Sequence, residues 1–133
     1  MNFMTFKLNS LFAVFLTAAF LLVDSQAASA QSTRYWNRSV APGKQIEFQW
    51  LNSNTNTCKD NGYPKLVINK QPSLGRFRTV KRKFRQQDGK CKGKNFSVLL
   101  VYYVAGRKRG VDNAAFTIAG QNNLKINLKI TVQ

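Results

Sequence analysis

The sequence predicts an all-β fold in which two sheets pack as a sandwich. Beyond residue 30, short apolar or alternating runs are separated by turn residues, and no stretch keeps the 3.6-residue period of an amphipathic helix. About seven such runs follow one another in roughly 100 residues, a number and spacing typical of an immunoglobulin-like β-sandwich. A small β-barrel is the alternative architecture, because a strand count does not distinguish closed sheets from open ones.

Two of the expected strands have the clearest patterns. In 124–132 aliphatic and polar residues alternate, so one face should be core and the other solvated. In 96–104 the apolar run from Val98 to Tyr103 is almost unbroken, which indicates a central strand covered on both faces. The other strands are expected at 35–40, 44–51, 65–70, 76–85 and 114–119.

Turn residues separate these strands. Glycine, proline, asparagine and aspartate gather where the chain must reverse, because each favours the backbone conformations of turns. The Asn- and Thr-rich segment 52–57 is interpreted as a polar loop that leads into Cys58. The expected turns lie at Pro42-Gly43, Asn61-Gly62, 72–75, Asp88-Gly89, 106–110 and 120–123.

The first thirty residues have the pattern of a secretory signal peptide. Lys7 precedes the apolar run 11–23, and Ala28-Ser29-Ala30 supplies the small residues that signal peptidase requires. At thirteen residues, this run is shorter than the roughly 20 that a membrane-spanning helix needs. We therefore expect a signal peptide over 1–30, cleavage near Ala30, and one exported domain over 31–133 that has no transmembrane segment and is periplasmic or secreted.

Two cysteines, Cys58 and Cys91, lie in the part expected to be exported. In an oxidising compartment such a pair predicts a disulfide, which should stabilise the fold by roughly 2 to 4 kcal/mol. A metal site or a reactive thiol is the alternative. Because the chain has no histidine, two sulfurs would make a poor zinc site. We expect no metal and no cofactor.

The stretch 76–85 is the most unusual feature of the sequence. It places six cationic side chains in ten residues, within a chain of formal net charge +16. Neighbouring cations repel one another, so this density is easiest to explain by a polyanionic surface that neutralises it. Charge on an exposed edge strand also discourages aggregation, which is the structural alternative. The cations are Arg76, Arg78, Lys81, Arg82, Lys83 and Arg85.

Two further groups of cations could belong to the same surface. If 76–85 and 96–103 pair as a hairpin, their connection adds Lys90, Lys92 and Lys94 near its tip. The second group, Arg107-Lys108-Arg109, lies in the turn after the apolar strand. The spacing of Phe77, Val80 and Phe84 changes phase within the basic stretch, which favours a bulge or an arm that projects beyond the sandwich.

Four short motifs follow one another in the second half of the chain. They are Gln71-Pro72-x-x-Gly75, Cys91-Lys92-Gly93, Val101-x-Tyr103 and Gly110-x-Asp112-x-x-x-Phe116. In this order they resemble the small exported immunoglobulin-like or cadherin-like modules of bacteria, especially alphaproteobacteria, which are mostly of unknown function and act as binding or structural units. Three residues separate Asp112 from Phe116 where that family has one, and Arg107-Lys108-Arg109 replaces the usual proline of the turn.

This resemblance implies a structural role for Gly110 and Asp112. We expect Asp112 to accept hydrogen bonds from turn backbone groups beside Gly110, since aspartate is favoured where backbone donors need a local acceptor. Calcium binding is the alternative. Calcium sites need several carboxylates, and only four acidic residues follow residue 30, each among positive charges.

The composition also argues against catalysis. Without histidine, a spare cysteine or a close pair of carboxylates, the chain lacks the groups for triad or glycosidase chemistry. The expected partner is an anionic polymer or surface, such as lipopolysaccharide, a cell-wall polymer or a host glycan. A host protein bound by a secreted effector or adhesin, a purely structural periplasmic role, and nucleic acid stacked on Tyr35, Trp36 or Trp50 are the alternatives.

Overall fold

The computed structural model describes residues 31–120 and 123–133, which form nine strands and contain no helix. The signal peptide expected over 1–30 lies outside these described residues. All seven predicted strands form, most of them one or a few residues longer than expected. The strands are β1 (Thr33–Val40), β2 (Gln45–Leu51), β3 (Ser53–Asn54), β4 (Lys59–Asp60), β5 (Lys65–Lys70), β6 (Gly75–Arg85), β7 (Asn95–Ala105), β8 (Gly110–Ala119) and β9 (Leu124–Val132).

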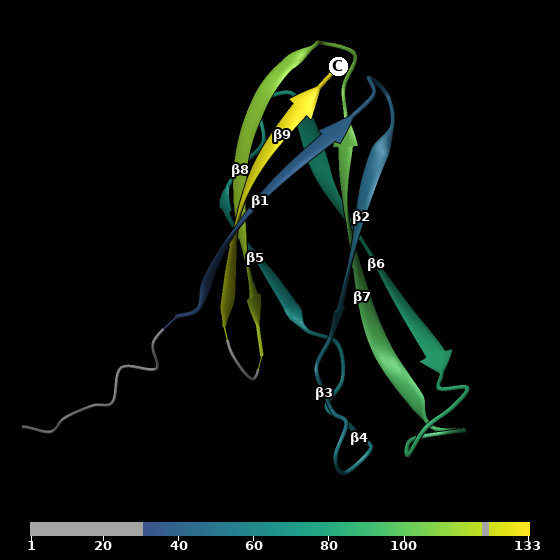
Figure 1. The fold of residues 1–133 in the computed structure, drawn as a ribbon. Coiled ribbons are helices and arrows are strands. Elements are labelled where there is room, and N and C mark those ends of the chain that lie inside the picture. The colour runs from purple at the N-terminus through teal and green to yellow at the C-terminus, as the bar shows by residue number, and fades with distance from the viewer. Residues whose placement is uncertain (1–30, 121–122) are drawn as a thin grey trace, which may run out of the picture.

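The seven long strands form two facing sheets, in the orders β1-β9-β8-β5 and β2-β7-β6 (Figure 1). If these strands are lettered A to G in chain order, the sheets become A-G-F-C and B-E-D. Immunoglobulin-like sandwiches have the same C-F-G and B-E-D groupings. The sheets remain separate, so the predicted sandwich is confirmed and the barrel alternative is wrong. The polar loop expected at 52–57 also differs, because β3 pairs there with β4.

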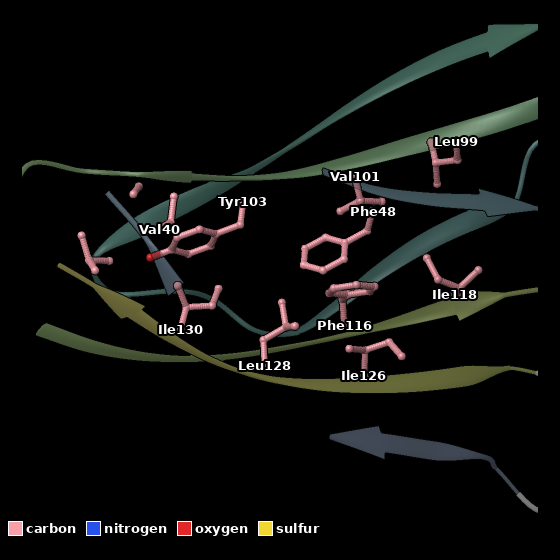
Figure 2. Close-up of a cluster of buried hydrophobic side chains, with 12 residues drawn as sticks. Val40, Phe48, Leu99, Val101, Tyr103, Phe116, Ile118, Ile126, Leu128 and Ile130 are labelled. Atoms are coloured by element: carbon pink, nitrogen blue, oxygen red, sulfur yellow. The ribbon is translucent and has the colours of Figure 1, made fainter. Parts of the chain in front are cut away.

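The core lies between the two sheets, and β9 and β7 build it as their patterns predict. Every second residue of β9 from Ile126 to Val132 is buried, and the intervening Asn127, Lys129 and Thr131 face outward. β7 is central in its sheet and is almost entirely buried. Figure 2 shows the interior, where Phe48, Val101 and Tyr103 of one sheet meet Phe116, Ile126, Leu128 and Ile130 of the other.

A buried carboxylate also joins the sheets. Asp112 of β8 is fully buried and accepts a hydrogen bond of 2.7 Å from the hydroxyl of Tyr103 on β7. The backbone N–H groups of Ser73 and Leu74, each at 2.8 Å, donate to its two oxygens. Asp112 thus accepts hydrogen bonds from turn backbone as the sequence suggested. The turn is the one at Ser73 and Leu74, which lie 39 and 38 positions earlier in the chain. Gly110 lies against the same turn, where a Cβ would come within 3.1 Å of Leu74.

These hydrogen bonds determine the ionisation of the carboxyl and the phenol. Burial alone would raise the pKa of Asp112, but the hydrogen bonds from Ser73, Tyr103 and Leu74 outweigh it, and the pKa is lowered. Burial, followed by the hydrogen bond to Asp112, raises the pKa of Tyr103. The phenol therefore remains a donor and the carboxylate an acceptor at neutral pH.

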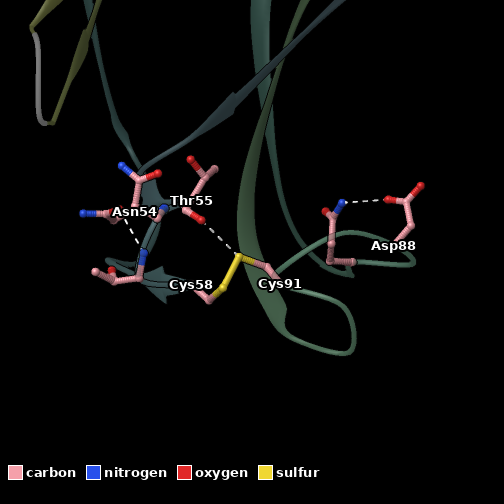
Figure 3. The surroundings of a disulfide bond; sticks show 8 residues. Asn54, Thr55, Cys58, Asp88 and Cys91 are labelled. Carbon is pink, nitrogen blue, oxygen red and sulfur yellow. Dashed lines mark hydrogen bonds between the residues drawn. A yellow bond between two sulfur atoms is a disulfide. The ribbon is translucent and has the colours of Figure 1, made fainter.

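The predicted disulfide between Cys58 and Cys91 is confirmed, with Cα atoms 5.3 Å apart (Figure 3). It joins the segment between β3 and β4 to the loop between β6 and β7. The Sγ atom of Cys91 lies 3.3 Å from the carbonyl oxygen of Thr55. Because a disulfide sulfur has no proton to donate, this is a close contact and not a conventional hydrogen bond. The disulfide fixes one end of the three-stranded sheet.

Candidate functional site

β6 carries the densest positive charge and forms an edge of its sheet. It pairs with β7 in one continuous antiparallel register, from Gly75 opposite Ala105 to Arg85 opposite Asn95. The hairpin assumed from the sequence is therefore present, but the bulge expected in this strand is wrong. The register irregularity lies instead in β5, between Ile68 and Lys70.

The change of phase in β6 has a different cause. Phe77 packs against the main core, whereas Val80 packs against a second cluster on the opposite face of the sheet, called here the outer cluster. Since side chains alternate along a strand, Arg76, Arg78 and Arg82 share the outward face with Val80. Lys81, Lys83 and Arg85 share the other face with Phe77. The outer cluster comprises Val98, Leu100 and Tyr102 with Val80 and Val104.

The lysines of β6 contact the segment that follows β4. The ring of Tyr63 lies 5.3 Å from Nζ of Lys81 and 5.7 Å from Nζ of Lys83. Within 31–120 and 123–133, the one salt bridge joins Lys83 to Asp60 at 3.3 Å. This end of the hairpin is therefore no free arm, because Asp60 and Tyr63 contact the lysines of its inner face and the disulfide fixes its loop.

The arginines of β6 border the outer cluster. The guanidinium of Arg78 lies over the ring of Tyr102, with its Cζ 4.6 Å from the ring centroid. The register places Arg76 beside Val104 and Arg82 beside Val98. Long arginine side chains can cover apolar surface with their stems while the charged groups remain in water. The result is a row of three arginines along the outer cluster.

The two other groups of cations lie at opposite ends of β6. Lys90, Lys92 and Lys94 belong to the loop after its last residue, which is closed by hydrogen bonds from the N–H of Gln86 to the carbonyl of Lys94 and from the N–H of Gly93 to the carbonyl of Gln86. The turn that carries Arg107, Lys108 and Arg109 begins at Gly106, whose N–H donates to the carbonyl of Leu74 just before β6. At about 3.3 Å per residue, the eleven residues of β6 separate the groups by roughly 35 Å. The predicted cations thus form an elongated strip and no compact patch.

The acidic residues of the described ranges already have partners. Asp112 is internal, and Asp88 accepts from the amide of Gln86. Asp60 accepts hydrogen bonds from the hydroxyl and N–H of Ser97, from the N–H of Gly62 and from Lys83. Burial alone would raise the pKa of Asp60, but these hydrogen bonds outweigh it and the pKa is lowered. Bonds with Gln49 and Tyr102 lower the pKa of Glu47. In the part of the chain that the structure describes, no three His, Cys, Asp or Glu residues are grouped as metal ligands would be.

The aromatic residues considered for base stacking fall into two classes. Trp36 and Trp50 stack on each other, with centroids 5.7 Å apart, and both pack at the margin of the core. Tyr35 is 81% exposed. It lies on β1, in the β1-β9-β8-β5 sheet, whereas the cations of β6 belong to the other sheet. The structure does not bring these three rings together with the cations of β6.

Two exposed apolar residues near the cations of β6, Leu51 and Phe84, were not predicted from the sequence as part of a site. Leu51 is 44% exposed and Phe84 38% exposed, and together they line two hollows of about 400 and 300 Å³. The sequence does contain a pattern that could have indicated them. β7 has apolar residues on both faces, so its neighbouring strands β2 and β6 need apolar side chains on both faces too. Val80 and Phe84 on β6 meet that need on the outward face.

Comparison of the chain with protein-family models, curated proteins and solved structures finds no match. The resemblance to exported bacterial modules therefore stays a prediction. Among the residues that the structure describes, no helix is long and apolar enough to cross a membrane.

Proposed function

We propose that this protein is an exported, non-enzymatic module that binds a polyanionic surface through the basic strip. The strip is defined as β6 with the cations of the loops at its two ends. The observation that carries the proposal is the imbalance of charge along this edge. Six cations stand on one strand, and within the described ranges only Lys83 forms a salt bridge.

The geometry of the strip suits an extended polymer with repeated negative charges. Arg76 and Arg78 are two residues apart on one face, so their Cα atoms lie roughly 7 Å apart along the strand, and Arg82 follows four residues later. Guanidinium groups bind phosphate, sulfate and carboxylate groups through paired N–H donors. A linear polyanion lying along β6 would meet successive cations over the whole length of the sheet.

The compartment and the absence of catalysis are parts of the same proposal. A disulfide is typical of proteins that fold in oxidising compartments, which supports export and a periplasmic or secreted location. The carboxylates of Asp60 and Asp112 are used in hydrogen bonds that hold the fold. With no histidine in the chain, binding is better supported than hydrolysis.

The experiment is retention on heparin across a salt gradient, with two triple variants that remove equal charge. One is Arg76→Gln/Arg78→Gln/Arg82→Gln on the outward face of β6. The other removes the outward-facing lysines of the β1-β9-β8-β5 sheet, Lys65→Gln/Lys125→Gln/Lys129→Gln. The arginine variant should elute at clearly lower salt, because each cation that no longer pairs with the polyanion weakens binding and its dependence on salt. The lysine variant should elute close to the unmodified protein.

Weak retention of all three proteins would instead support the structural alternative, in which the cations serve solubility or keep the edge strand from pairing with other chains. If both variants elute together with the unmodified protein at low salt, the strip binds no polyanion and the proposal fails. If the unmodified protein is retained on heparin, parallel columns of lipopolysaccharide and DNA compare its affinity for the three polymers. Lys81→Gln/Arg82→Gln/Lys83→Gln adds a third comparison, and its thermal melt should change little.

A further inference from the structure

The outward face of the β2-β7-β6 sheet ends in exposed apolar side chains. Leu51 ends β2 and is 44% exposed, and Phe84 lies near the end of β6 and is 38% exposed. Between them, the register places Val98 beside Leu51 and Phe96 beside Phe84. The rings of Phe84 and Phe96 are 5.8 Å apart. We name Leu51, Phe84, Phe96 and Val98 the apolar end.

Two hollows meet at the apolar end. The larger, of about 400 Å³, is lined by Val98, Leu100 and Tyr102, by the cations Arg82 and Lys83, and by one acid, Glu47. The smaller, of about 300 Å³, extends toward the loop after β6 and includes Lys90 and Asp88. Leu51 and Phe84 line both hollows. Apolar surface and positive charge thus lie side by side over one end of the sheet.

This combination narrows the chemistry of the anionic partner. A hydrated polymer such as heparin would engage the cations and leave Leu51 and Phe84 in water. A lipid surface offers both parts, since phosphate headgroups attract Arg and Lys while the boundary with the acyl chains accepts apolar side chains. We propose that the apolar end docks on a membrane surface rich in phosphate headgroups. Leu51 and Phe84 enter the acyl boundary while Arg82 and Lys90 meet the phosphates.

Charge complementarity favours this occupant over a second copy of the chain. Two copies that met through this face would bring together two surfaces that each carry Arg76, Arg78 and Arg82 against one acid, Glu47. Like charges brought together at an interface are strongly unfavourable. An anionic lipid surface neutralises them. This inference rests on the proposed binding of polyanions and names the class of surface that the strip recognises.

The test measures binding to sedimented vesicles of phosphatidylcholine, with and without phosphatidylglycerol, and heparin retention of the same samples. The oxidised protein is prepared as the full chain and as a chain beginning at Gln31, whose folding a cooperative melt verifies. The variant is Leu51→Ser/Phe84→Ser. The matched control is Val67→Ser/Val111→Ser, which removes two exposed apolar side chains, 44% and 52% exposed, from the other sheet.

We expect binding to the phosphatidylglycerol vesicles only, and about tenfold or greater weakening in Leu51→Ser/Phe84→Ser, because two apolar side chains no longer enter the acyl boundary. Heparin retention should stay unchanged in this variant, and both properties should stay unchanged in the control. Equal vesicle binding by the variant and the control would overturn the inference while leaving the polyanion proposal intact. So would a dimer that only Leu51→Ser/Phe84→Ser dissociates. Failure of the unmodified protein to bind heparin would instead overturn the proposed function.

Discussion

The outward face of the β1-β9-β8-β5 sheet carries polar residues such as Asn113, Lys129 and Thr131 with separate exposed valines at Val67 and Val111, whereas that of the β2-β7-β6 sheet carries a continuous apolar centre bordered by arginines. The first is mainly the solvated face that one side of a sandwich sheet ordinarily presents. The second has more apolar surface than a two-layer sandwich needs, because the core already covers the other face of β7. Both sheets therefore bury their inward faces in the same core, but only the β2-β7-β6 sheet carries a second apolar cluster on its outward face.

Loss of Asp112 should produce the largest effect, because this carboxylate joins the two sheets. Asp112→Ala leaves two backbone N–H groups and the Tyr103 hydroxyl without an acceptor, at roughly 1 to 3 kcal/mol each. We expect a loss of about 3 kcal/mol or more in the free energy of unfolding, measured by urea denaturation.

A variant on the opposite face of β8 gives the matched control. Thr117→Ala removes the hydroxyl that donates to Asn69 at 2.7 Å and should cost about 1 kcal/mol. If Asp112→Ala were as mild as Thr117→Ala, the inward faces would not depend on this carboxylate.

Reduction of the disulfide should act unequally on the two sheets. Opening the link between Cys58 and Cys91 should lower the free energy of unfolding by about 2 to 4 kcal/mol, since the unfolded chain regains the freedom of a closed loop. Hydrogen exchange should quicken first in 52–60 and 86–94, and last in β8 and β9. A Cys58→Ser/Cys91→Ser variant should show the same pattern without reductant, and uniform quickening would contradict the unequal effect.

Acid should remove the stabilising hydrogen bonds that two carboxylates, Asp112 and Asp60, accept in the folded protein. The pKa of Asp112 and that of Asp60 are lower in the folded protein than in the unfolded chain. Their stabilising contributions are complete above the unfolded pKa of about 4 and disappear as the pH falls through the folded values. Thermal melts between neutral pH and pH 2 should show this loss below about pH 4. In Asp112→Asn the pH dependence should be shallower, and an unchanged slope would remove Asp112 from the explanation.

The smallest effect is expected at the salt bridge. The side chain of Lys83 is 59% exposed, and exposed ion pairs contribute about 0 to 1 kcal/mol. Lys83→Gln should therefore change the free energy of unfolding by less than about 1 kcal/mol in a urea titration. A larger loss would mean that the segment of Asp60 and Tyr63 depends on this lysine.

Local patterns were sufficient for most of the fold. The alternation in 124–132 and the apolar run in 96–104 correctly predicted β9 and the central position of β7, because burial on one face or on both leaves a direct mark on residue order. The cysteine pair likewise predicted the disulfide. Each of these inferences needs only the neighbours of a residue or the compartment of the chain.

The missing parts depended on contacts between residues far apart in the sequence. Asp112 finds its backbone donors at Ser73 and Leu74, and no spacing within 106–116 encodes that pairing. Val80 and Phe84 lie on the outward face of β6, opposite to Phe77, so a pattern with one apolar face per strand places a bulge between them where none exists. The separation of Lys90–Lys94 from Arg107–Arg109 follows from strand direction, which composition does not specify.

The parallel pairing of β1 with β9 ties the first described strand to the last, from Thr33 beside Lys125 to Val40 beside Val132. During synthesis, β1 emerges before β9, its neighbour in the sheet, has been made. The hairpins β6-β7 and β8-β9 can form from adjacent segments, but the margin of the four-stranded sheet has to wait for β9. The order of translation therefore leaves the first strand without a partner until residues 124–132 have left the ribosome.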